Sequence, residues 1–114
     1  MNTVGDLIKE LELEVMAGDQ EAMDKAVTGV YIGDLLSWVM SRIETGNIWV
    51  TIQTHVNVVA VALLGEASCI IIPEGAEIEQ DTIVKAEEEG IPLLRSKLSA
   101  YELAVRMEAC GIKK

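Results

Sequence analysis

A run of hydrogen-bonding side chains at residues 51–57 offers the clearest chemistry in this 114-residue sequence. The run joins two apolar segments, and it contains Thr51, Gln53, Thr54, His55 and Asn57. Hydroxyl, amide and imidazole groups can hydrogen-bond a small polar or anionic ligand. In an open parallel α/β sheet, ligands bind where the carboxyl end of a strand meets the N-terminus of a helix. We therefore predict a ligand site at these five residues.

A purely structural interpretation of the same run stays open. In that interpretation Thr54 caps the helix that follows, while His55 and Asn57 satisfy nearby backbone groups. Thr51 and Gln53, near the end of the preceding strand, would follow whichever interpretation holds.

Strands and helices that alternate along the chain must position this run. Apolar, β-branched stretches predict strands, the first of them half-buried at a sheet edge, over residues 11–16, 27–32, 48–52, 68–72 and 91–94. Amphipathic or apolar stretches between caps and glycines predict helices over residues 3–10, 35–43, 55–64, 81–89 and 99–110. Gly33 and Asp34 are expected to cap the second helix. Short connections indicate parallel strands joined through helices. The sequence therefore predicts an α/β fold, a single domain over residues 1–114 with a mostly parallel sheet flanked by helices.

Charge and composition exclude several classes of partner. The chain has 19 acidic and 9 basic residues, so its formal net charge is −10. Such a surface repels nucleic-acid phosphates and anionic lipid. No apolar run approaches the roughly 18 residues of a membrane span. Cys69 and Cys110 show no disulfide or metal-site spacing, so we expect a cytoplasmic protein. We also expect it to bind neither nucleic acid nor membranes.

The sequence contains none of the common catalytic motifs. It has no GxxxxGK[ST] loop and no GxGxxG, so nothing in it cradles the phosphates of a kinase substrate. His55 is the single histidine, and with two distant cysteines it cannot supply a metal site within one chain. We predict that the protein is not an enzyme and needs no cofactor and no metal.

The helix expected over residues 55–64 is difficult to bury in so small a domain. From residue 56 onward Asn57 is its only polar residue, and a helix that is apolar all round must be covered on nearly every side. We therefore expect a homodimer in which this helix contributes to the interface. Trp38 and Trp49 could each lie either in the core or at such an interface.

Several segments of the sequence resemble the DRTGG domain family. They are residues 29–36, 49–64, 67–75, the Ala-Glu-Glu-Glu-Gly-Ile-Pro-Leu-Leu run at 86–94, and the Ser-Ala-Tyr-Glu helix start at 99–104. The resemblance implies a small α/β domain related to the N-terminal, non-catalytic domain of HPr serine kinase/phosphorylase. It also implies a regulatory or dimerising role, since family members accompany phosphotransacetylase or CBS domains.

One departure from the family lies within the predicted site. The family commonly carries Gly-Asp-Arg where the strand meets the helix, and this sequence has Gln53-Thr54-His55 there. An amide, a hydroxyl and an imidazole replace the charged pair, whose role cannot be carried over. We predict a non-catalytic regulatory or dimerisation module, and the alternative prediction is a small-molecule sensor. The sensor would bind a nucleotide or a phosphorylated metabolite at residues 51–57. Either interpretation implies a binding partner, which would be another protein or a small-molecule ligand.

Overall fold

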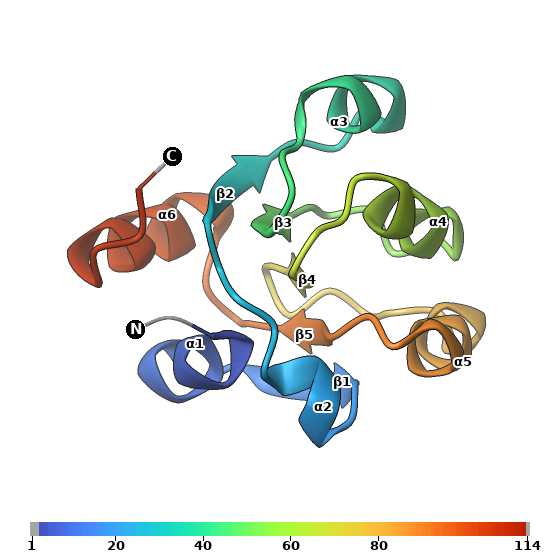
Figure 1. Ribbon diagram of the computed structural model, residues 1–114, viewed down its shortest axis with the longest axis horizontal. Helices are drawn as coiled ribbons and strands as arrows, with labels where there is room; N and C mark the ends of the chain where they lie inside the picture. Colours follow the sequence, from blue (N-terminus) through green and yellow to red (C-terminus); the bar gives the residue numbers. More distant parts are fainter. Residues whose placement is uncertain (1–2, 114) are drawn as a thin grey trace.

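The computed structural model of the protein describes residues 3–113, which form one sheet between two layers of helices (Figure 1). The strands are β1 (Glu14–Ala17), β2 (Gly29–Ile32), β3 (Asn47–Val50), β4 (Cys69–Ile72) and β5 (Leu93–Arg95). The helices are α1 (Val4–Leu11), α2 (Gln20–Met23), α3 (Leu36–Arg42), α4 (Asn57–Leu64), α5 (Gln80–Glu89) and α6 (Ala100–Ala109).

The sheet has the strand order β1-β5-β4-β3-β2. The strands from β2 to β5 pair in parallel, each with its neighbour in the sequence, and β1 pairs antiparallel with β5. The prediction of a mostly parallel sheet with the first strand at an edge is therefore confirmed. The carboxyl ends of β2, β3, β4 and β5 consequently lie along one edge of the sheet.

Both faces of the sheet are covered, which explains the apolar runs of the central strands. On one face Trp49, Ile70 and Leu93 pack against α3, α4 and α5. On the other face Ile48 and Ile71 pack against α1 and α6 (Figure 1). Strands that are buried on two sides cannot show polar alternation, so their type was recognisable from apolar, β-branched content alone.

The first strand begins later than the sequence pattern predicts. Residues 11–16 alternate between apolar and acidic side chains, but α1 continues to Leu11, which is buried like Leu7 one turn earlier. Glu12 then takes a left-handed conformation, with φ 52°, and ends the helix. β1 starts only at Glu14. The alternation was ambiguous because its first residue also fits the apolar stripe of the helix.

Two predicted helix caps are wrong. α3 begins after Leu35 and α4 after Val56, and neither start has a side-chain cap. The Asp34 carboxylate instead accepts hydrogen bonds from residues after β3, and Thr54 lies two residues before Val56, the residue after which α4 begins. The capping box predicted at the start of α6 is confirmed.

Helix α4 is better covered within the chain than the sequence predicts. Its buried residues are Val58, Val59, Val61 and Ala62, and the helix packs beside α3 and α5. Its accessible apolar residues are Ala60 and, in the last turn, Leu63 at 40% and Leu64 at 72% exposure.

The two tryptophans have different environments. Trp49 is fully buried, so the interpretation as core packing is confirmed for this residue. Trp38 is 56% exposed on α3, where the guanidinium of Arg42 lies 4.0 Å from its ring centre.

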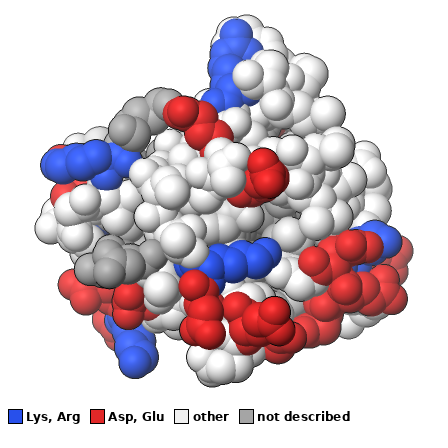
Figure 2. Space-filling model, in the orientation of Figure 1, with Lys and Arg blue, Asp and Glu red and all other residues white. Residues whose placement is uncertain are grey.

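Charges are unevenly distributed over the surface. Figure 2 shows acidic side chains gathered over α5, at the lower right, whereas the area over α4 carries few charged residues. None of the helices in residues 3–113 is long and apolar enough to cross a membrane.

Candidate functional site

The carboxyl ends of β2 and β3 bring two of the predicted site residues together with a residue that the sequence did not indicate. Thr51 follows β3, and its hydroxyl donates to Asp34 Oδ1 at 2.8 Å. The backbone N–H of Ile52 donates to the same oxygen at 2.9 Å. Gln53 Nε2 donates to the Asp34 carbonyl at 3.1 Å. The hydrogen bonds of Asp34 thus tie the two strand ends to each other.

The other three predicted residues lie on the turn that leads into α4. The Thr54 carbonyl accepts from the Thr82 hydroxyl at 2.7 Å. His55 Nδ1 accepts from the backbone N–H of Asn57 at 3.2 Å, so this ring satisfies a local backbone group as the structural interpretation predicts. Gln53, His55 and Asn57 remain exposed. Ligand binding by residues 51–57 stays a prediction.

An acidic pocket of 290 Å³ lies beside these strand ends. It is lined in part by Ile32, Asp34, Thr51, Pro73, Glu74 and Ala100. Its charged lining residues are the carboxylates of Asp34 and Glu74. A site with two carboxylates and no basic side chain favours a cation or hydrogen-bond donors over an anion.

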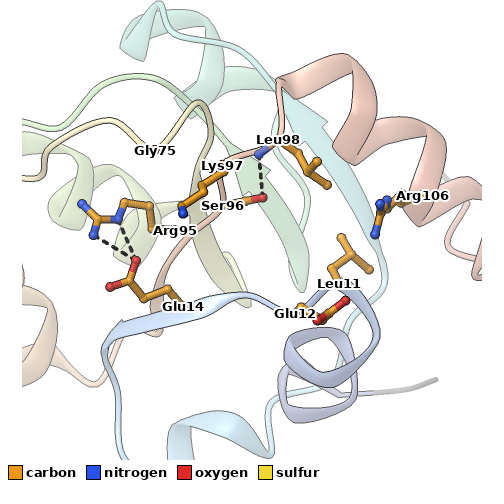
Figure 3. Close-up of a pocket in the computed structure, with 9 residues that line it drawn as sticks. All are labelled: Leu11, Glu12, Glu14, Gly75, Arg95, Ser96, Lys97, Leu98 and Arg106. Carbon is orange, nitrogen blue, oxygen red and sulfur yellow. Dashed lines mark hydrogen bonds and ion pairs between the residues drawn. The ribbon is translucent and has the colours of Figure 1, made fainter.

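A basic pocket of 410 Å³ lies further along the same edge, where β5 ends (Figure 3). Its lining includes Leu11, Glu12, Glu14, Arg95, Lys97 and Arg106. Arg95 and Lys97 come from β5 and the loop after it, Arg106 from α6, and the two glutamates from the end of α1 and from β1. Figure 3 shows Lys97 and Arg106 on two sides of this pocket.

The three basic residues of this pocket are not equivalent. Arg95 is neutralised, because its Nε and a terminal nitrogen both lie 2.9 Å from Glu14 Oε1. The ion pairs found within residues 3–113 include neither Lys97 nor Arg106. Within that part of the chain neither is held in an ion pair, and Arg106 interacts electrostatically with Glu102 one turn earlier on α6, so both can turn toward a ligand.

Hydrogen bonds hold the loop that carries Lys97. The N–H groups of Glu74 and Gly75 donate to the carbonyls of Leu98 and Ser96 at 2.8 and 2.7 Å. The N–H of Leu98 donates to Ser96 Oγ at 3.1 Å. These bonds fix the loop between the ends of β4 and β5, so the site is formed before any ligand binds.

The capping box fixes the other end of this loop, where α6 begins. Ser99 Oγ accepts from the N–H of Glu102, and the Glu102 carboxylate accepts from the N–H of Ser99. The hydrogen bonds from Ser99 hold the pKa of Glu102 below its ordinary value, and Arg106 acts in the same direction. The helix that carries Arg106 therefore starts at a defined position.

Sequence reasoning missed Asp34, Arg95, Lys97 and Arg106. A signal for Arg95 and Lys97 was present, since both lie just after a predicted strand in a chain with few basic residues. Nothing in the linear sequence indicated that Arg106 would lie beside them. Among residues 3–113 no group of three His, Cys, Asp or Glu side chains could hold a metal ion.

Cysteine is the most nucleophilic type of side chain in the sequence, but Cys69 is too deeply buried to react. This thiol is fully buried in β4, and burial raises its pKa to about 12. A thiolate is the reactive form of cysteine, so Cys69 is inert in the folded protein at neutral pH.

We expect an aromatic disulfide reagent at neutral pH to modify one thiol of the native protein, because Cys110 is partly accessible and Cys69 is not. In denaturant two thiols should react. The Cys110→Ser variant, as a control, should show no fast reaction in its native state. A fast reaction in that variant would contradict the burial of Cys69. The measurement is the absorbance of the released thiolate.

Comparisons with known proteins agree with this architecture. The family model of the DRTGG domain matches residues 6–110, which confirms the resemblance seen in the sequence. Among solved structures, one similar chain holds the CBS and DRTGG domains of the regulatory region of Clostridium perfringens pyrophosphatase, complexed with its activator, diadenosine tetraphosphate. The TM-score is 0.76 at 13% identity, and the match covers 93% of this chain and 46% of that one. A search of curated proteins finds no match. The relation to HPr serine kinase/phosphorylase stays a prediction.

Proposed function

The chain belongs to the DRTGG domain family, and from this premise we propose that it is a non-catalytic regulatory module that works as a homodimer in the cytoplasm. The match over residues 6–110 is the observation that carries the proposal. The pyrophosphatase neighbour has its DRTGG domain in a regulatory region. The present chain spans less than half of that neighbour, and the activity that it would regulate is part of the proposal.

The environments of His55 and Cys69 support a role without catalysis. His55 uses Nδ1 to accept a backbone hydrogen bond, and Cys69 is buried with a raised pKa. A nucleophile needs a base within hydrogen-bond reach, and the partners of these two side chains are backbone and a buried serine. The unpaired cysteines also suit a reducing compartment.

An apolar surface formed by Met40, Leu63 and Leu64 supports dimerisation. Met40 on α3 is 48% exposed, and Leu64, at the end of α4, is 72% exposed. Met40 and Leu64 line the same depression between the two helices, which Glu44 and Glu66 also line. Figure 2 shows few charges over α4. We call these three residues the α3–α4 surface and propose that it meets its own copy in the dimer.

We expect the Met40→Glu, Leu64→Glu double variant to be monomeric at concentrations where the unmodified protein is a dimer. Placing carboxylates in an apolar contact leaves charges desolvated without partners. The measurement is the molar mass by sedimentation equilibrium. The matched control is Val84→Glu with Val105→Glu, since both valines are exposed to a similar degree on α5 and α6.

The control should leave the dimer intact. An unmodified protein that is monomeric at all concentrations would contradict the dimer. A dimer disrupted by the control, and not by changes on α3 and α4, would place the interface elsewhere and contradict the proposed surface.

A small-molecule sensor that uses residues 51–57 is the second candidate function. Its support is that Gln53, His55 and Asn57 are exposed at the edge where the parallel strands end. A ligand bound there should raise the thermal midpoint, and the Gln53→Ala, His55→Ala variant should abolish the rise.

A further inference from the structure

We propose that the basic pocket at the end of β5 binds the phosphate group of a small molecule, with Lys97 and Arg106 as the residues that contact it. This site is separate from residues 51–57 and does not depend on the proposed dimer. Its support is a concentration of positive charge, an available cavity and a rigid loop.

The concentration of basic residues is the first argument. The chain has 9 lysines and arginines against 19 acidic residues, yet three of the basic residues line this one pocket. A surface that is acidic elsewhere repels anions, so a local cluster of cations is where an anion can bind.

The pairing of the charges is the second argument. Glu14 neutralises Arg95 at 2.9 Å, and this pair forms one wall of the pocket. Within the described residues no ion pair engages Lys97 or Arg106, and both side chains are exposed. An arginine offers a planar set of donors that matches phosphate oxygens, and a lysine adds a point charge. Together they can neutralise a phosphate dianion.

The shape and rigidity of the pocket are the third argument. Its volume of 410 Å³ is within the range of about 300–1,000 Å³ for small-molecule sites. The loop that carries Lys97 is fixed by the hydrogen bonds of Glu74, Gly75 and Leu98. Gly75 lies under the Lys97 stem, since a Cβ atom there would be 3.8 Å from Lys97 Cγ. A ligand therefore need not order this loop, which lowers the entropic cost of binding.

The acidic pocket on the same edge gives an internal comparison. Its carboxylates, Asp34 and Glu74, would repel the phosphate that the basic pocket attracts. Glu12 also lines the basic pocket (Figure 3), and its carboxylate can accept hydrogen bonds from hydroxyl groups of the same ligand. A phosphate ester with hydroxyl groups matches both features of this lining.

The test is a calorimetric titration with inorganic phosphate and with adenosine monophosphate, at constant ionic strength. We expect saturable binding that weakens about tenfold in Lys97→Gln and about tenfold in Arg106→Gln, because each substitution removes a charge-assisted contact. The matched controls are Lys85→Gln and Arg42→Gln, which remove the same charge at exposed positions outside the pocket. These controls should bind as the unmodified protein does.

Each outcome decides the proposal. Tighter binding of the nucleotide than of phosphate supports a phosphate ester as the ligand, and equal binding supports the free ion. Absence of saturable binding of both probes, or equal losses in the pocket variants and the controls, would overturn the site. Sedimentation of the same variants separates this result from a failure of the proposed dimer, because Lys97 and Arg106 lie outside the α3–α4 surface.

Discussion

The Trp49→Ala variant is expected to lose about 3–5 kcal/mol of unfolding free energy, the typical cost of removing a large aromatic side chain from a core. Trp49 has no exposed surface and packs between the sheet and the helices α3 to α5. Its Nε1 also donates to the Gly33 carbonyl at 2.9 Å, which joins β3 to the residue after β2. The measurement is urea denaturation followed by circular dichroism.

The second tryptophan of the chain is the matched control. Trp38 is 56% exposed, and its main contact is the stacked guanidinium of Arg42. The Trp38→Ala variant should lose about 1 kcal/mol or less. Similar losses in the two variants would contradict the assignment of Trp49 to the core and Trp38 to the surface.

The Asp34→Ala variant is expected to lose about 2–3 kcal/mol of unfolding free energy, because hydrogen bonds to a charged group are among the stronger ones. Its carboxylate accepts from the Thr51 hydroxyl and from the Ile52 N–H. Thr51 is only 1% exposed, so its hydroxyl would lose this acceptor in a place that water scarcely reaches. The measurement is again chemical denaturation at neutral pH.

Two controls separate the hydrogen bonds of Asp34 from its charge. Asp34→Asn keeps an acceptor oxygen and should lose less than the alanine variant. Asp24→Ala removes a carboxylate from an exposed position after α2 and should change stability little. Equal stability of Asp34→Ala and Asp24→Ala would show that Asp34 does not hold the strand ends together.

The parallel part of the sheet could be predicted because its signals are local. The apolar stretches at β3 and β4 are too short and too β-branched for helices, and the short connections leave little choice of topology. The antiparallel pairing of β1 with β5 could not be predicted in the same way. It depends on contacts between residues such as Glu14 and Arg95, which lie 81 positions apart in the sequence.

The helix starts show where local rules fail. Asp34 and Thr54 are residue types that favour caps, but a tertiary contact engages the Asp34 carboxylate, and the N-cap position of α4 lies two residues after Thr54. The parallel register places Ile32 opposite Val50, so the residues that follow these two strands must meet. Asp34 reaches Thr51 for this reason. Applying that register to the sequence would have added Asp34 to the residues expected beside Thr51.

The predicted site residues lie at the edge where the parallel strands end, and ligand binding by them stays a prediction. Thr51 and Gln53 meet Asp34 at that edge, whereas Lys97 and Arg106, which we propose as the phosphate contacts, line a different pocket beyond β4. The hydrogen-bonding run was visible because its members are adjacent in the sequence. The basic pocket was not, because α1, β1, β5 and α6 each contribute to its wall.

The pairing of β1 with β5 also has a consequence for the order of folding. The units from β2 to β5 join neighbours along the chain, whereas β1 must wait for a partner at the other end of the sequence. Closing a long loop costs entropy before its contacts are made, and distant pairings form slowly. We therefore expect the basic pocket to be completed late on the folding pathway, when the first residues of the chain dock against the last strand.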